Sequence, residues 1–190
     1  FGRVGEGVND GGLSRRHITR QVEASLKRLG TDRLDIYFCH MFDPQTPMEE
    51  TISTMDDLVK QGKIVYPAVS NWSSWQIMKA QGIAERKHQA RFECMQPMYN
   101  LAKRQAEVEL LPMAQSEQIG VIPYNPLGGG LLTGKYTRQA KPTVGRLVDN
   151  KMYGIRYGDD AYYDVVERYI AYCQERSVSP VSLAVAWVMS

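Results

Sequence analysis

The chain has 190 residues, of which 43% are hydrophobic and 23% charged, as is ordinary for a soluble globular protein with a sizeable core. Its net charge of +2 comes without a basic cluster, so neither nucleic acid nor an anionic membrane is an expected partner. No run approaches the roughly 20 apolar residues that cross a bilayer, and no secretory signal is visible. The cysteines, Cys39, Cys94 and Cys173, form no CxxC pair, which indicates buried thiols in a reducing, cytoplasmic setting.

Short apolar runs alternate with longer amphipathic stretches along the chain, a pattern typical of strands and helices. The first helix is predicted to begin at the capping residue Ser14 and to end at Gly30. Buried strands are predicted at 35–40, 66–70, 92–96 and 120–124, and further helices at 47–61, 73–86, 104–117, 161–176 and 180–190. The stretch 137–160 lacks such a pattern, and we expect a mobile flap there.

Strands that are apolar throughout, each followed by a helix, indicate a parallel sheet covered by helices. The predicted strands end at His40, Ser70, Gln96 and Tyr124, with spacings of 30, 26 and 28 residues, about the length of one βα unit. No glycine fingerprint follows the first strand, which disfavours a Rossmann-type sheet. We therefore predict an α/β fold, about the second half (strands 4–7) of a (β/α)8 TIM barrel, with residues 1–190 as a single partial domain truncated at both termini.

Polar side chains end each of the four predicted strands: His40, Ser70 with Asn71, Gln96, and Tyr124 with Asn125. In a parallel barrel the carboxyl ends of the strands lie on one rim, where active sites form. A single histidine or amide at a strand end is more often structural or a loop cap. Four successive strands with such ends favour a functional site.

The segment from Pro126 to Lys135 follows the fourth strand and contains three consecutive glycines. Backbone amides freed by glycine, together with one lysine, could hold an anion, although a bare glycine triplet is also typical of a flexible turn. The spacing from Gly129 to Lys135 matches a P-loop, but Tyr136 occupies the position of the magnesium-binding Ser or Thr. A nucleotide triphosphatase is therefore disfavoured.

Several motifs cover nearly the whole chain in a specific order: Gly12-Leu-Ser-Arg-Arg-His-Ile18, Asp35-Ile-Tyr-Phe-Cys-His40, Val69-Ser-Asn-Trp72, Gln96-Pro-Met-Tyr-Asn100 and the segment Pro126 to Lys135. Together they resemble the aldo-keto reductase superfamily. Within it, Arg28-Leu29, Asp43-Pro44, Pro47 to Thr51 and Trp72-Ser73-Ser74 resemble the bacterial branch that is also similar to potassium-channel β-subunits. The resemblance implies a cofactor-dependent oxidoreductase that reduces a small carbonyl substrate.

The resemblance also implies roles for the matching residues. His40 corresponds to the catalytic histidine, which orients and polarises the substrate carbonyl. Ser70, Asn71 and Gln96 correspond to the groups that bind the nicotinamide carboxamide, and Tyr124 to the aromatic residue that stacks on the nicotinamide ring. The loop that embraces the cofactor pyrophosphate corresponds to Asn125, Pro126, Leu127, Gly128, Gly129 and Lys135.

The family's catalytic Asp, Tyr and Lys would precede Phe1, so the chemistry belongs to a longer parent chain. NADPH as the cofactor is a family expectation. Met41 and Trp72 follow strand ends and are candidates for an apolar substrate pocket, although they could also cover the rim of the core. The oligomeric state is left open.

Two other functional classes are weighed. A regulatory subunit that keeps the cofactor and acts by binding a partner is the alternative, and the imidazole of His40 argues against it. A metal hydrolase is disfavoured because the strand ends carry no cluster of histidines and carboxylates. His17 and His88 lie on predicted helical segments and are expected at the surface.

Overall fold

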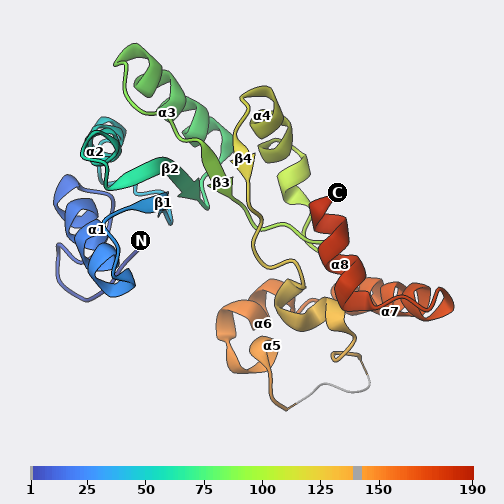
Figure 1. Ribbon diagram of the computed structural model, residues 1–190. Coiled ribbons are helices and arrows are strands. Elements are labelled where there is room, and N and C mark those ends of the chain that lie inside the picture. Colours follow the sequence, from blue (N-terminus) through green and yellow to red (C-terminus); the bar gives the residue numbers. More distant parts are fainter. Residues whose placement is uncertain (1, 139–142) are drawn as a thin grey trace. The chain divides into compact units, whose positions relative to one another are not determined.

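Figure 1 shows a computed structural model of the protein, which describes residues 2–138 and 143–190. The chain forms two compact units. The first comprises Phe1–Pro97 and Glu109–Ile122, and the second comprises Met98–Val108 and Pro123–Ser190. Within the described residues, no helix is both long and apolar enough to cross a membrane.

A parallel sheet of four strands in the order β1-β2-β3-β4 is the centre of the first unit. The register pairs Cys39 with Val69 and Ser70 with Gln96, so the carboxyl ends of the first three strands lie along one edge. This parallel α/β arrangement confirms the predicted fold class and is consistent with part of a (β/α)8 barrel. The strands are β1 (Leu34–Cys39), β2 (Ile64–Ser70), β3 (Cys94–Gln96) and β4 (Gly120–Val121).

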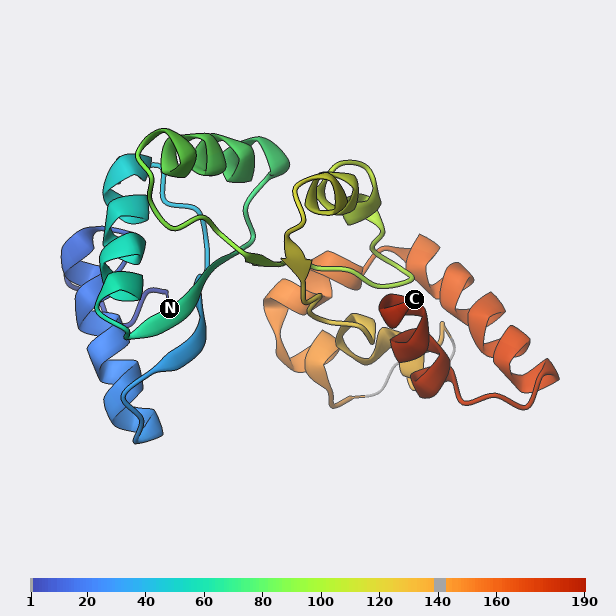
Figure 2. The ribbon, with the colours of Figure 1, turned by 45° about the horizontal axis from the view of Figure 1, so that its top comes forward.

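Three helices of the first unit begin and end largely where the sequence predicts: α1 (Arg15–Leu29), α2 (Met48–Lys60) and α3 (Ser74–Arg86). The fourth is α4 (Leu110–Ser116). Ser14 caps α1 by accepting a hydrogen bond from the amide of His17, and Gly30 ends it with φ 66°. Figures 1 and 2 show α1 and α2 side by side beside β1 and β2, and α2 also packs against α3.

Apolar side chains spaced three or four residues apart face the sheet and form the core of the first unit. Ile18 and Val22 of α1, and Ile52 and Met55 of α2, are almost fully buried. Burial of one such side chain stabilises the fold by roughly 1.5–3 kcal/mol. The three cysteines are buried and free, as expected, and burial raises the pKa of the Cys39 thiol to about 12.

The second unit consists mainly of helices around the glycine-rich segment. A 3₁₀ segment η2 (Gly128–Thr133) contacts each of the four α-helices that follow it. Its Leu131 and Leu132 are fully buried, together with Tyr136 and Tyr157. The other elements are η1 (Gln105–Glu107), α5 (Arg146–Asp149), α6 (Lys151–Tyr157), α7 (Asp160–Glu175) and α8 (Pro180–Met189).

Three predicted elements differ from the structure. The strand expected at 120–124 covers only Gly120–Val121, and Tyr124 forms an isolated bridge with Met98 in the second unit. The single helix expected at 104–117 is divided into η1 and α4, because Pro112 has no N–H for a hydrogen bond to the preceding turn and fits only near a helix start. The irregular stretch expected at 137–160 is wrong for residues 146–157, which form α5 and α6. Leu147 and Tyr157 are buried there, so apolar anchors fold this segment. Residues 139–142 of the expected flap lie outside the described residues.

Candidate functional site

The ends of β1, β2 and β3 are joined by hydrogen bonds between the residues that the sequence singled out. Asn71 Nδ2 donates to the carbonyl oxygen of His40 at 2.9 Å and to Ser70 Oγ at 3.0 Å. Ser70 Oγ in turn donates to the carbonyl oxygen of Gln96 at 2.8 Å. The structure therefore brings these four residues together at one edge of the sheet, and we call them the strand-end row.

Asn71 turns the chain as it leaves β2. Its φ of 59° lies in the left-handed region, which asparagine tolerates better than most residues. In this conformation its side chain reaches back to the end of β1. The asparagine thus fixes the spacing between His40 and Ser70.

Gln96 ends β3 with a half-buried side chain. Within the described residues, no hydrogen bond engages its side-chain amide, whereas the backbone carbonyl accepts from Ser70. A primary amide carries both donors and an acceptor, so it is complementary to another carboxamide. Gln96 is therefore the member of the strand-end row best suited to hold a nicotinamide carboxamide.

His40 follows β1 and is exposed beside a small cavity of about 270 Å³. A Cβ atom on Gly2 would lie 3.2 Å from His40 Nδ1, so a glycine there leaves room against the ring. The imidazole can donate a hydrogen bond to a carbonyl oxygen. The cavity is lined by Gly2, Arg3, Gly11, Gly12, Leu13, His40, Met41, Phe42 and Asp43, all in the first unit.

The two residues proposed for a substrate pocket lie in different surroundings. Met41 is exposed and lines the cavity. Trp72 is only 5% exposed and packs edge-on against Phe42 and Phe92, with ring centroids 5.1 and 5.6 Å away. In this structure Trp72 therefore covers the core, which was the other interpretation of its position.

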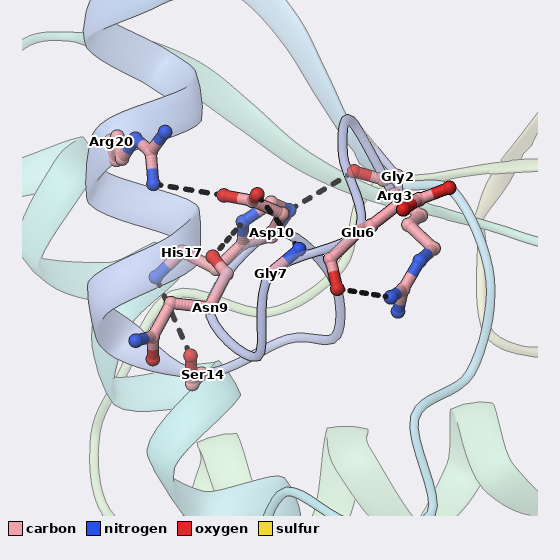
Figure 3. A network of polar contacts seen from close by, with 9 residues as sticks. All are labelled: Gly2, Arg3, Glu6, Gly7, Asn9, Asp10, Ser14, His17 and Arg20. Carbon is pink, nitrogen blue, oxygen red and sulfur yellow. Dashed lines mark hydrogen bonds and ion pairs between the residues drawn. The ribbon is translucent and has the colours of Figure 1, made fainter.

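The expectation that His17 lies at the surface is wrong. Its ring is fully buried beneath the segment before α1, where Nδ1 lies 3.1 Å from the Asn9 carbonyl oxygen and Nε2 lies 3.0 Å from that of Gly2 (Figure 3). Sequence periodicity could not reveal this contact, because that segment has no regular structure. His88 is exposed, as expected, in the turn after α3.

Tyr124 is a half-buried residue of the second unit, bridged to Met98. Burial raises the pKa of its phenol, and the positive charge of Arg156 partly offsets this effect. The phenol therefore stays neutral at physiological pH. An uncharged aromatic face is suited to stacking on a flat ring.

The backbone amides of the glycine-rich turn donate hydrogen bonds to acceptors within the turn itself. Gly128 N–H donates to the carbonyl oxygen of Asn125 at 2.9 Å, Gly129 N–H to Asn125 Oδ1 at 2.7 Å, and Gly130 N–H to the carbonyl oxygen of Leu127 at 3.0 Å. These three amides are thus not open donors in this structure, unlike the expectation from the sequence. Leu127 and Pro126 complete the turn and are half-buried.

A buried polar network fixes this turn. Asn125, in the left-handed region with φ 67°, donates from Nδ2 to Tyr157 Oη at 2.7 Å. Asn100 Nδ2 donates to the same oxygen and to the carbonyl oxygen of Asn125, both at 3.0 Å. The motifs that suggested the family included Asn100 but gave it no role, and no sequence pattern indicated Tyr157.

Lys135 is exposed just after the turn. Its Nζ lies 4.9 Å from the centroid of the Tyr136 ring, a cation–π contact, and no described carboxylate pairs with it. It therefore presents a positive charge that an anion could approach. In the described part of the chain, no group of three or more His, Cys, Asp or Glu side chains could hold a metal ion.

A sequence model of the aldo/keto reductase family matches residues 3–190. The chain is 38% identical to a probable voltage-gated potassium channel subunit beta of Arabidopsis thaliana, over 98% of this chain and 58% of the relative. It is 34% identical to an uncharacterised oxidoreductase of Bacillus subtilis, over 97% and 55%. It is 34% identical to versiconal hemiacetal acetate reductase of Aspergillus parasiticus, over 100% and 55%. The chain spans about half the length of the curated relatives it matches.

Proposed function

The chain belongs to the aldo/keto reductase family, and we propose that its full-length parent reduces aldehydes or ketones to alcohols with NADPH. The observation that carries the proposal is the strand-end row, in which an exposed imidazole lies beside a hydrogen-bonded line of amide and hydroxyl groups. In the reaction, the carbonyl carbon gains a hydride with its two electrons, and the carbonyl oxygen gains a proton. A bound reduced nicotinamide supplies that hydride and is oxidised.

In this proposal His40 orients the substrate by donating a hydrogen bond to the carbonyl oxygen. A donor at this place favours the transition state, because negative charge grows on that oxygen as the hydride arrives. The proton that completes the alcohol comes from a family tyrosine upstream of this chain. Asn71 positions His40 through its hydrogen bond to the His40 carbonyl.

In this proposal the first unit supplies the contacts to the nicotinamide carboxamide. Gln96 offers an unengaged amide to the nicotinamide carboxamide, and Ser70 and Asn71 fix the strand ends beside it. In the second unit, Tyr124 is assigned to the ring and Lys135 to the diphosphate. There Asn125, Gly128 and Gly129 shape the turn, while the charge of Lys135 is the feature that attracts phosphate.

The test is carbonyl-dependent oxidation of NADPH by the full-length protein, followed by absorbance with a panel of aldehydes. His40→Gln is expected to lower kcat by about 100-fold, because a positioned donor to the carbonyl contributes on the order of 10²–10³. His88→Gln, which alters an exposed histidine in a turn, is the matched control and should leave kcat unchanged. Equal kcat values for the His40→Gln variant and the wild type would contradict the assignment.

The relative named as a probable potassium channel subunit beta supports a second candidate, a cofactor-binding subunit that acts through a partner. A binding subunit has no need of an imidazole at the end of β1. Absence of NADPH oxidation with every aldehyde, together with retained NADPH binding, would favour this second function. A comparison of kcat/KM with NADPH and NADH tests the cofactor assignment.

A further inference from the structure

The cavity beside His40 offers a ligand free hydrogen-bond donors, whereas its carboxylate is already engaged. Its single described cation is Arg3, whose guanidinium carries five N–H donors. Arg3 Nη2 donates to the carbonyl oxygen of Glu6 at 3.2 Å, and no described carboxylate forms an ion pair with it. Most of the donors of Arg3 therefore remain for a ligand.

The one carboxylate that lines the cavity, Asp43, is already engaged by the protein. Asp43 Oδ2 accepts from the amide of Leu13 at 2.8 Å and from Thr46 Oγ1 at 2.6 Å, while Asp43 Oδ1 accepts from the amide of Gln45 at 2.9 Å. Burial acts to raise the pKa of Asp43, but these hydrogen bonds outweigh it and lower the pKa. The carboxylate is thus charged and satisfied by the protein, so a ligand gains little by donating to it.

The segment that carries Arg3 is held in place from both sides (Figure 3). His17 contacts the carbonyl oxygen of Gly2, the residue before Arg3. Val4, the residue after it, donates its amide to the carbonyl oxygen of Asp10 at 2.8 Å. Asp10 also pairs with Arg20 of α1 at 3.0 Å. Arg3 is therefore presented by a braced segment, which lowers the entropic cost of binding a ligand.

Two glycines line the cavity next to its polar side chains, Gly11 beside Arg3 and Gly2 beside His40. A Cβ atom at Gly11 would lie 3.3 Å from Arg3 Nη1, and one at Gly2 would lie 3.2 Å from His40 Nδ1. Any side chain at either place would press on the guanidinium or the imidazole. Apart from Asp43 and Gly12, the remaining wall is apolar and is formed by Leu13, Met41 and Phe42.

We propose that Arg3 is a specificity-determining residue that selects carbonyl substrates carrying a carboxylate, with their apolar portion against Met41 and Phe42. The inference rests on the proposed function, because it places the reacting carbonyl at His40. A guanidinium binds a carboxylate with charge-assisted hydrogen bonds, often two in parallel. A cavity of about 270 Å³ suits a small oxo acid rather than a bulky ketone.

The experiment compares two aldehydes of the same chain length, 5-oxopentanoate and pentanal, with the full-length protein and NADPH. The wild type is expected to favour 5-oxopentanoate in kcat/KM by about 30-fold, the worth of a charge-assisted pair. Arg3→Gln should remove this preference, mainly by raising KM for 5-oxopentanoate, with a much smaller change in kcat/KM for pentanal. Arg3→Lys should retain part of the preference, because it keeps the charge but loses the planar fork.

Arg16→Gln is the matched control, since it removes the same charge from an exposed position on α1 outside the cavity. Equal losses for both aldehydes in Arg3→Gln, or an equal response in Arg16→Gln, would overturn the inference. Reduction of pentanal by the wild type without a preference for 5-oxopentanoate would overturn the inference and leave the proposed function standing. Reduction of neither aldehyde, nor of any other in the panel, would overturn both.

Discussion

The strand ends of the first unit and the glycine-rich turn of the second unit use polar groups in different ways. In the first unit, backbone carbonyls and one asparagine hold the row together, while the side chains of His40 and Gln96 keep their donors and acceptors available. In the second unit, three glycine amides and two asparagine side chains are all engaged within the protein. The strand ends of the first unit therefore leave polar side chains available to a ligand, whereas the polar groups of the turn mainly hold its own conformation.

The two units use asparagine for different purposes. Asn71 directly follows β2 and Asn125 follows the bridge residue Tyr124, and both lie in the left-handed region, with φ 59° and 67°. Asn71 clamps one strand end to its neighbour, while Asn125 bonds to Tyr157 and to the turn that follows it. Variants that disturb packing should therefore be costly in the second unit, and variants of the strand-end row should change function first.

The largest effect on stability is expected from Gly129→Ala. A Cβ atom at this position would lie 2.6 Å from Tyr153 Cδ1, and φ is +70°. Overpacking costs about 1–3 kcal/mol and the left-handed conformation adds about 1–2 kcal/mol, so we expect a loss of about 3 kcal/mol. Urea-induced unfolding of the full-length protein measures the change.

Gly30→Ala is the matched control in the first unit. Gly30 has a nearly identical φ of +66°, but nothing lies within 4 Å of the Cβ position. Only the conformational cost of about 1–2 kcal/mol should appear there. Equal losses of unfolding free energy in Gly129→Ala and Gly30→Ala would show that the close packing of α6 on the turn does not determine the stability of this region.

A smaller loss, about 2 kcal/mol, is expected from Tyr157→Phe. The hydroxyl accepts hydrogen bonds from Asn100 and Asn125, and its removal leaves the buried amide of Asn100 and the half-buried amide of Asn125 without that acceptor. The same unfolding measurement tests this expectation. A change below about 0.5 kcal/mol would mean that the network is not needed to hold the turn, because a surface substitution has an effect of that size.

Most of the fold could be predicted from the sequence, because the chain repeats a unit of one strand followed by one helix. Short apolar runs and caps such as Ser14 and Gly30 are local signals, and the structure has strands and a capped helix at these places. Full burial of the strands was not predicted correctly, because Ile36, Val65 and Tyr66 are exposed. Local signals failed where distant contacts decide the conformation. The segment 146–157 folds because Leu147 and Tyr157 are buried against η2, and His17 is buried because an irregular segment covers it.

For the candidate site too, the sequence could predict what local patterns determine and could not predict what distant contacts determine. Parallel strands end at one edge, so sequence alone could indicate that His40, Asn71 and Gln96 meet. The engaged amides of the glycine turn could not be foreseen, because their acceptors depend on the left-handed conformation of Asn125 and on the path of the turn. Arg3 was missed because it lies in an irregular segment, and only the cavity connects it to His40.

The smallest effect is expected from Trp72→Phe in the first unit. No described acceptor lies within hydrogen-bonding distance of the buried Trp72 Nε1, unlike the fully engaged hydroxyl of Tyr157. Replacing the indole loses about 1 kcal/mol of apolar burial, but removing an unsatisfied N–H regains about 1–3 kcal/mol. The free energy of unfolding should therefore stay the same or rise by about 1 kcal/mol, and kcat/KM for pentanal should not change. A loss of more than about 2 kcal/mol would reveal a partner for the indole, and an altered kcat/KM would return Trp72 to the substrate pocket.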